Sequence, residues 1–278
     1  MNKNGRTHLV TEFSLLGILA LTLFFALPFW FMFVFATHTD SAIFSVPTPI
    51  WFGNQLQENY QSLLRHLPAF WLNVKTSLYI SSATALLNIL LCALSGCAFA
   101  IYDFPGKGLL LKAVILSLLF PSVLTMMPTA IMVSFLDWFN QPRALIIPAA
   151  CGSFGVLFIK QYIEQAITQD MVDAARVNGC NELQVFRHVV LPAITPALAS
   201  VGLLTFIGAW NNLLTPLIVL KDPNLFTAPL ALRSLQGVGA MPWGAICLGA
   251  SLTTLPFVIL LALTARWIYR VTYHNAEV

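Results

Sequence analysis

The densest group of ionisable side chains lies late in the chain, at residues 170–192, in the stretch DMVDAARVNGCNELQVFRHVVLP. Its acids and bases are Asp170, Asp173, Arg176, Glu182 and Arg187, with His188 beside them. Their spacing has no catalytic geometry, and the chain contains no HExxH, GxSxG or GxxxxGK[ST] motif for zinc, nucleophile or phosphate chemistry. We therefore predict that the chain is not an enzyme and that this stretch forms a surface for a partner.

The rest of the chain is too apolar to be soluble. Of its 278 residues, 58% are hydrophobic and only 9% are charged, and the mean hydropathy is +0.79. A soluble domain carries about 25% charged residues. The net charge of +3 is too small to indicate binding to nucleic acid. Membrane lipid must cover such a chain, and we predict a polytopic membrane protein.

Six uncharged segments are long enough to cross a bilayer, which takes about 20 apolar residues. The fourth is short, but Lys160 can extend its side chain to the membrane surface and let the helix continue. The first has too long an apolar core for a cleaved signal peptide, so a retained anchor is expected. The prediction is one all-α transmembrane domain, residues 1–278, with spans at 13–36, 76–102, 113–136, 144–163, 193–220 and 242–265.

The basic residues indicate the orientation of these spans. With the N-terminus in the cytoplasm, nine of the 14 lysines and arginines lie inside, as the positive-inside rule requires. Both termini and the loop at 164–192, between spans 4 and 5, are then cytoplasmic. Residues 37–75 form the longest outer segment. They could bind an external partner or form a packed loop.

Polar and small residues within the spans predict where helices meet. The second span repeats small side chains at helical spacing, which lets backbones approach closely in lipid. Asn88 lies among them and should face protein. Pro121 and Pro128 should bend the third span. In the fifth span, Asn211 and Asn212 point about 100° apart, so at least one faces the interior, where it could bond a sugar-like hydroxyl or a neighbouring helix.

The stretch at 170–192 has its own helix signals. Asp170 can cap a helix from Met171 to Asn178, and Gly179 suits the left-handed position that ends a helix. Asn181 and Gln184 have the spacing of a second capping box. That second helix should stop at Pro192. The prediction is helix, glycine turn, helix.

This stretch resembles the motif of bacterial ABC importer permeases: Glu-Ala-Ala, three residues, Gly, nine residues, then Ile, any residue, Leu-Pro. Here Asp173-Ala174-Ala175, Gly179 and Val189-Val190-Leu191-Pro192 match it, with Asp for Glu and Val for Ile. The run Gly208-Ala209-Trp210-Asn211-Asn212 resembles the fifth span of the maltose-type, sugar-importing branch. The likeness extends over nearly the whole chain.

The resemblance implies a mechanism and partners. The first helix of the loop would be a coupling helix seated on an ATP-binding subunit, with the contacts made by Asp173, Ala174, Ala175, Gly179, Leu191 and Pro192. Two ATP-binding subunits would hold the ATP and Mg, and this chain would hold no cofactor. A second similar permease and an external solute-binding protein would complete the importer in the bacterial inner membrane. The substrate pathway would include Trp210, Asn211 and Asn212.

The cargo is left open between several classes. No span has a charged residue at its centre, which favours a neutral, hydroxyl-rich sugar over an ion. The same machinery could carry a polyamine or a glycerol phosphate. A self-sufficient secondary carrier is another alternative, and it would transport without nucleotide. A membrane enzyme or assembly factor is disfavoured by the missing catalytic motifs.

Overall fold

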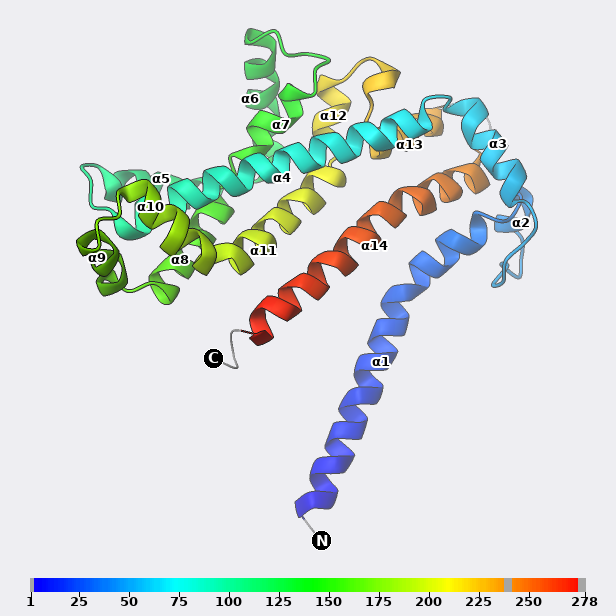
Figure 1. Cartoon of the computed structure of the whole chain (residues 1–278). Helices are drawn as coiled ribbons and strands as arrows, with labels where there is room; N and C mark the ends of the chain where they lie inside the picture. The colour runs from blue at the N-terminus through cyan, green and yellow to red at the C-terminus, as the bar shows by residue number, and fades with distance from the viewer. Residues whose placement is uncertain (1–2, 238–241, 275–278) are drawn as a thin grey trace. The chain divides into compact units, whose positions relative to one another are not determined.

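The computed structural model describes residues 3–237 and 242–274, and every element in them is helical, without a strand (Figure 1). The predicted all-α class is therefore confirmed for the described part of the chain. The chain divides into two compact units, residues 1–68 with 232–254 and residues 69–231 with 255–278. The helices are α1 Lys3–Phe35, α2 Asp40–Ile43, α3 Leu56–His66, α4 Phe70–Ile101, α5 Lys107–Ser117, α6 Ser122–Phe135, α7 Arg143–Ala150, α8 Ser153–Ala166, α9 Gln169–Val177, α10 Glu182–Val185, α11 Leu191–Trp210, α12 Leu214–Val219, α13 Ala228–Ser234 and α14 Trp243–His274.

The first unit contains α1 to α3 and the start of α14. Its connecting segment is tied down by hydrogen bonds. The Asn59 amide donates to the carbonyls of Ala36 and His38, both at 2.9 Å. The backbone N–H of Gly244 donates to the Asp40 carboxylate at 2.9 Å. These contacts support the packed-loop alternative for this part of residues 37–75.

The second unit is organised around α4, which packs along α11, α8 and α7 (Figure 1). The predicted stripe of small residues on α4 is buried in these contacts. At Gly96, an added Cβ would lie only 2.7 Å from the Ile159 side chain and 3.1 Å from the backbone nitrogen of Lys160. The missing side chain is what allows α4 and α8 to approach so closely.

Among the described residues, five helical segments are long and apolar enough to span a membrane: Leu15–Phe35, Phe70–Ile101, Arg143–Ala166, Glu182–Trp210 and Trp243–Leu260. The predicted third span, 113–136, is not one helix. It divides into α5 and α6, with Pro121 immediately before α6. Proline lacks the N–H that a continuous helix needs there. Within α6, the apolar stretch Val123–Phe135 is shorter than a membrane span needs, so six spans stay a prediction.

Two other apolar segments are also interrupted. The fourth is broken at residues 151–152, between α7 and α8. The fifth, predicted as continuous over 193–220, ends as α11 at Trp210 and resumes as α12 at Leu214. The helix is therefore interrupted within this segment, and the polar pair Asn211 and Asn212 bonds backbone groups on either side of the break.

Asn88 supports the break in the fourth segment. Its amide donates at 2.7 Å to the carbonyl of Ala150, the last residue of α7, and its oxygen accepts from the Thr205 hydroxyl of α11 at 2.9 Å. The side chain is only 2% exposed. The prediction that Asn88 faces protein is confirmed, and its amide supplies a partner for a carbonyl that the helix end leaves free.

Candidate functional site

The polar loop, residues 164–192, folds as a helix, a glycine turn and a second helix. Gly179 has φ +86° and follows the last turn of α9. Its N–H donates to the Arg176 carbonyl at 2.9 Å, and the Cys180 N–H donates to the Ala175 carbonyl at 3.1 Å. This pair of bonds is the Schellman motif, in which a left-handed residue closes the helix. The predicted role of Gly179 as a helix terminator is confirmed.

The start of α9 differs from the prediction. The helix begins at Gln169 with Thr168 as its N-cap, so Asp170 lies in the first turn and is not the cap. The Asp170 carboxylate still lies at the positive end of the helix dipole. The second capping signal is confirmed, because Asn181 and Gln184 exchange both bonds of a capping box, at 2.8 and 2.9 Å.

The prediction that the second helix stops at Pro192 was wrong. Helix α10 continues into a π-helical turn, Phe186–Val190, and then directly into α11. Pro192 lies in the first turn of α11. The π turn shifts the hydrogen bonding, so that the Leu191 N–H reaches the Phe186 carbonyl. Pro192 has no N–H to donate, so the helical run continues through it with one hydrogen bond fewer.

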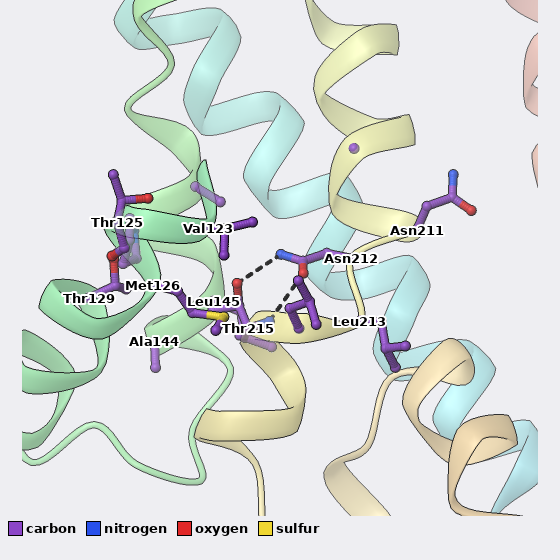
Figure 2. Close-up of a pocket in the computed structure, with 14 residues that line it drawn as sticks. Val123, Thr125, Met126, Thr129, Ala144, Leu145, Asn211, Asn212, Leu213 and Thr215 are labelled. Carbon is purple, nitrogen blue, oxygen red and sulfur yellow. Dashed lines mark hydrogen bonds between the residues drawn. The ribbon is translucent and has the colours of Figure 1, made fainter. Parts of the chain in front are cut away.

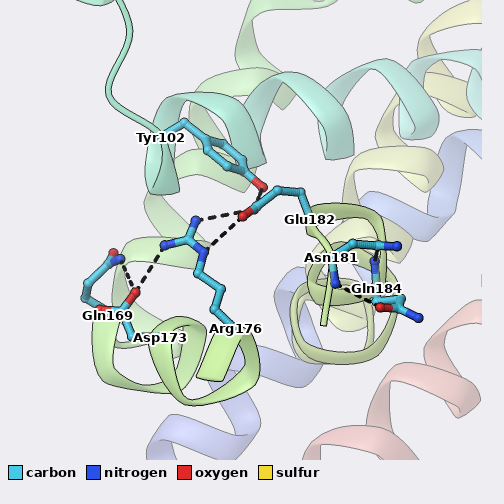
Figure 3. A network of polar contacts seen from close by, with 7 residues as sticks. All are labelled: Tyr102, Gln169, Asp173, Arg176, Asn181, Glu182 and Gln184. Atoms are coloured by element: carbon cyan, nitrogen blue, oxygen red, sulfur yellow. Dashed lines mark hydrogen bonds and ion pairs between the residues drawn. The ribbon is translucent and has the colours of Figure 1, made fainter. Parts of the chain in front are cut away.

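A chain of polar contacts crosses the loop (Figure 3). Arg176 donates to Asp173 at 3.1 Å and to both oxygens of Glu182 at 3.0 and 3.3 Å. Hydrogen bonding to Glu182 is the main cause that raises the pKa of Arg176. The Tyr102 hydroxyl, just beyond α4, donates to the second Glu182 oxygen at 2.5 Å.

The loop presents a mixed surface above a buried base. Val172 and Val185 are each 1% exposed and belong to the apolar cluster that joins the loop to α4, α8 and α11. Asp173 and Ala174 are exposed and Ala175 is half-buried. Val177 and Leu183 are 88% and 72% exposed. Sequence reasoning did not select these two as docking residues, although each is an apolar residue near the glycine turn.

A cavity of about 640 Å³ lies where the broken segments meet (Figure 2). Its walls come from α6, from α7 and from the break between α11 and α12. None of the described residues that line it is charged. The polar lining side chains are hydroxyls and amides: Thr125, Thr129, Asn211, Asn212 and Thr215. Such groups can hydrogen-bond a neutral ligand in either direction.

The side chains of the three residues predicted for the substrate pathway lie in different surroundings. Asn212 points toward Thr215, with its amide 3.2 Å from the hydroxyl and its oxygen accepting from the Thr215 N–H at 3.3 Å (Figure 2). Asn211 also lines the cavity, but its exposed side chain points to the other side and donates to the Ile207 carbonyl. Trp210 is 4% exposed and stacks on Phe206, so it does not line this cavity.

Sequence reasoning missed Thr125 and Thr129 on α6. Their signal was two hydroxyls four residues apart, on one face of a helix that also contains Pro128. No group of His, Cys, Asp or Glu side chains suited to a metal ion occurs in the described residues.

The helical fold, the apolar segments and the uncharged cavity define a membrane transport component. Residues 21–273 match the binding-protein-dependent transport system inner membrane components, and the chain belongs to that family. The predicted class is therefore confirmed: a permease subunit of an ABC importer, not an enzyme, that acts with ATP-binding and solute-binding subunits.

Individual relatives carry different cargoes. The chain is 30% identical over 210 residues to the arabinooligosaccharides transport system permease protein AraQ of Halalkalibacterium halodurans, covering 76% of this chain and 75% of the relative. It is 28% identical over 273 residues to the sn-glycerol-3-phosphate transport system permease protein UgpE of Salmonella typhi, covering 95% of each. A solved bacterial ABC transporter involved in importing the acidic polysaccharide alginate shares the fold, with TM-score 0.79, 18% identity and coverage of 96% of this chain and 98% of that chain.

Proposed function

We propose that this permease forms one half of the pathway for a neutral sugar or oligosaccharide. The observation that carries the proposal is the cavity lining, which offers hydroxyls and amides and no charge among its described residues. Sugar hydroxyls both donate and accept, and such side chains match them. Asn212 is our primary contact residue, with Asn211 at the edge. Trp210 contributes by supporting the helix end through its stack on Phe206.

We further propose that the polar loop couples this pathway to ATP. Both termini and the loop face the cytoplasm in a six-span topology, with α5 and α6 together forming the third span. Two ATP-binding subunits hold the ATP and Mg, and a second, unlike permease completes the pathway. The loop would dock through Asp173, Ala174, Ala175 and Gly179, beside the exposed Val177 and Leu183. Leu191 and Pro192 would join it to α11.

The second candidate cargo is a glycerol phosphate, favoured by the relative that matches over 95% of both chains. A phosphate is bound in proteins by Arg forks, by the point charge of a Lys ammonium, or by free N–H groups at helix ends. The described lining of the cavity includes the starts of α6 and α12, but it has no arginine or lysine. A polyamine would need carboxylates, which this lining also lacks. The neutral cargo therefore fits the cavity better.

Reconstituted uptake tests these proposals. The full importer, with its solute-binding protein, should take up neutral oligosaccharide with ATP, and an excess of sn-glycerol-3-phosphate should not compete. Uptake of only charged solutes would refute the sugar assignment. Vesicles that contain this chain alone should not transport, because a nucleotide-independent flux would indicate a secondary carrier.

The docking role has a separate test. Ala175→Glu and Gly179→Asp should abolish ATP-driven uptake while membrane insertion stays normal. Normal uptake by both variants would refute the coupling role of the loop.

A further inference from the structure

One hydrogen bond connects the polar loop to the end of a long helix outside it. Tyr102 is the first residue after α4 and lies 80 positions from its partner Glu182. Its backbone is also held, because the Lys107 ammonium donates to the Tyr102 carbonyl at 2.9 Å and to Asp103 at 3.0 Å. The phenol therefore projects from an anchored position at the end of α4.

Arg176 extends this contact to α9. Its guanidinium donates two hydrogen bonds to the Glu182 carboxylate, and its third nitrogen donates to Asp173 on its own helix. A planar fork fixes direction as well as distance, which a lysine ammonium cannot do. We call these four residues, Tyr102, Glu182, Arg176 and Asp173, the Tyr102 clamp (Figure 3).

The clamp is distinct from the packing that folds the loop. Val172 and Val185 already bury the base of α9 and α10 in the apolar cluster. The clamp residues lie above this base, and the ion pair between Arg176 and Glu182 is partly exposed, at 34% and 54% of the two side chains. Exposed ion pairs add little to stability. Their directional bonds instead restrain how α9 is oriented relative to the end of α4.

We propose that Tyr102 and Arg176 are positioning residues for coupling, which hold α9 to the end of α4 so that the loop and α4 move as one body. This inference rests on the proposed coupling function. Since α4 packs along α7, α8 and α11, a displacement of α9 would pass through the clamp into the helices around the cavity. Without the clamp, the loop could turn on its apolar base while α4 stayed in place.

The test is Tyr102→Phe in the complete reconstituted importer. The substitution removes only the hydroxyl that donates to Glu182. The number of substrate molecules imported per ATP hydrolysed should fall roughly two- to fivefold, the factor that a partly exposed charged contact provides. Hydrogen exchange at the α9 amides should rise. Membrane insertion and melting temperature should stay at the wild-type values.

Tyr162→Phe is the matched control. Tyr162 is half-buried on α8 beside the same apolar cluster, and its hydroxyl has no hydrogen bond in the part of the chain that the structure describes. Its substitution should leave coupling unchanged. In a Glu182→Ala background, Tyr102→Phe should have no further effect, because the acceptor is already absent.

The outcomes separate the clamp from the function on which it rests. A wild-type complex without ATP-driven uptake would overturn the proposed function itself. A coupled wild type with an unchanged import ratio in Tyr102→Phe would overturn the clamp alone. A melting temperature that falls in Tyr102→Phe but not in Tyr162→Phe would make the contact a folding element, and it would also overturn the positioning role.

Discussion

Replacing Gly179 by alanine measures the free energy that glycine saves by adopting the left-handed backbone at the turn. Gly179 has φ +86°, and a Cβ built on it meets nothing within 4 Å. The substitution therefore creates no clash with neighbours, and its whole cost is the left-handed backbone, about 1–2 kcal/mol for a residue with a side chain. That energy corresponds to roughly a 5- to 30-fold change in the local equilibrium.

The assay is hydrogen exchange at the two amides of the Schellman motif, those of residues 179 and 180. Exchange there should accelerate by roughly the same 5- to 30-fold factor, since the strain favours opening of the turn. ATP-driven uptake should fall with it. Gly179→Asn should have a smaller effect, because asparagine tolerates the left-handed conformation better.

Gly106→Ala is the matched control for this experiment. Gly106 has φ +83° and equally open surroundings, but it lies at the N-cap of α5, outside the polar loop. It should show a similar local strain with unchanged uptake. If Gly179→Ala left exchange at residues 179 and 180 unchanged, or if both glycine variants reduced uptake equally, our account of the turn would be refuted.

Three further substitutions test the packing and the cavity. Gly96→Ala should lower the stability of the detergent-solubilised protein by about 1–3 kcal/mol, because its Cβ would collide with Ile159; an unchanged melting temperature would contradict the close contact. Asn88→Ala should cost about 1–2 kcal/mol by leaving the Ala150 carbonyl unpaired, while a neutral result would show that water replaces the amide. Asn212→Ala should weaken apparent substrate affinity in uptake assays roughly three- to tenfold; a loss of folded yield alone would make Asn212 an interhelical contact.

Local signals in the sequence predicted the polar loop well. The left-handed Gly179 and the capping box of Asn181 and Gln184 depend on backbone preferences that act over three or four residues. The errors in the prediction of the polar loop were also local. The N-cap is Thr168 in place of Asp170, and helix ends vary by one or two residues among equally suitable caps.

The interruptions of the spans were harder to predict. Hydropathy measures apolar length, and residues 193–220 are apolar throughout apart from a few amides and hydroxyls. Whether such a segment stays helical depends on partners elsewhere. Asn88, 62 positions away from Ala150, is one of these partners. The cost of a polar side chain in lipid predicted that Asn88 faces protein, but it could not say which carbonyl the amide would reach.

Most residues that line the cavity lie beyond local reasoning for the same reason. Asn212 was selected because an unpaired amide is costly in lipid, and it does line the cavity. Thr125 and Thr129 share the lining only because the break before α6 brings that helix into the cavity wall. Trp210 was selected with its neighbours in the motif, yet its side chain is buried against Phe206.

The π turn at Phe186–Val190 lets the chain hold one extra residue without changing the direction of the polar loop. A π turn holds one residue more than an α turn needs, and the chain runs helically through it from α10 into α11. Because the extra residue is absorbed within this one turn, Val185 keeps its place in the apolar cluster. A further inserted residue that the turn did not absorb would rotate everything before it by about 100° around the axis of α11, and Glu182 would turn away from Tyr102. Deleting the extra residue should therefore be tolerated better than inserting a second one.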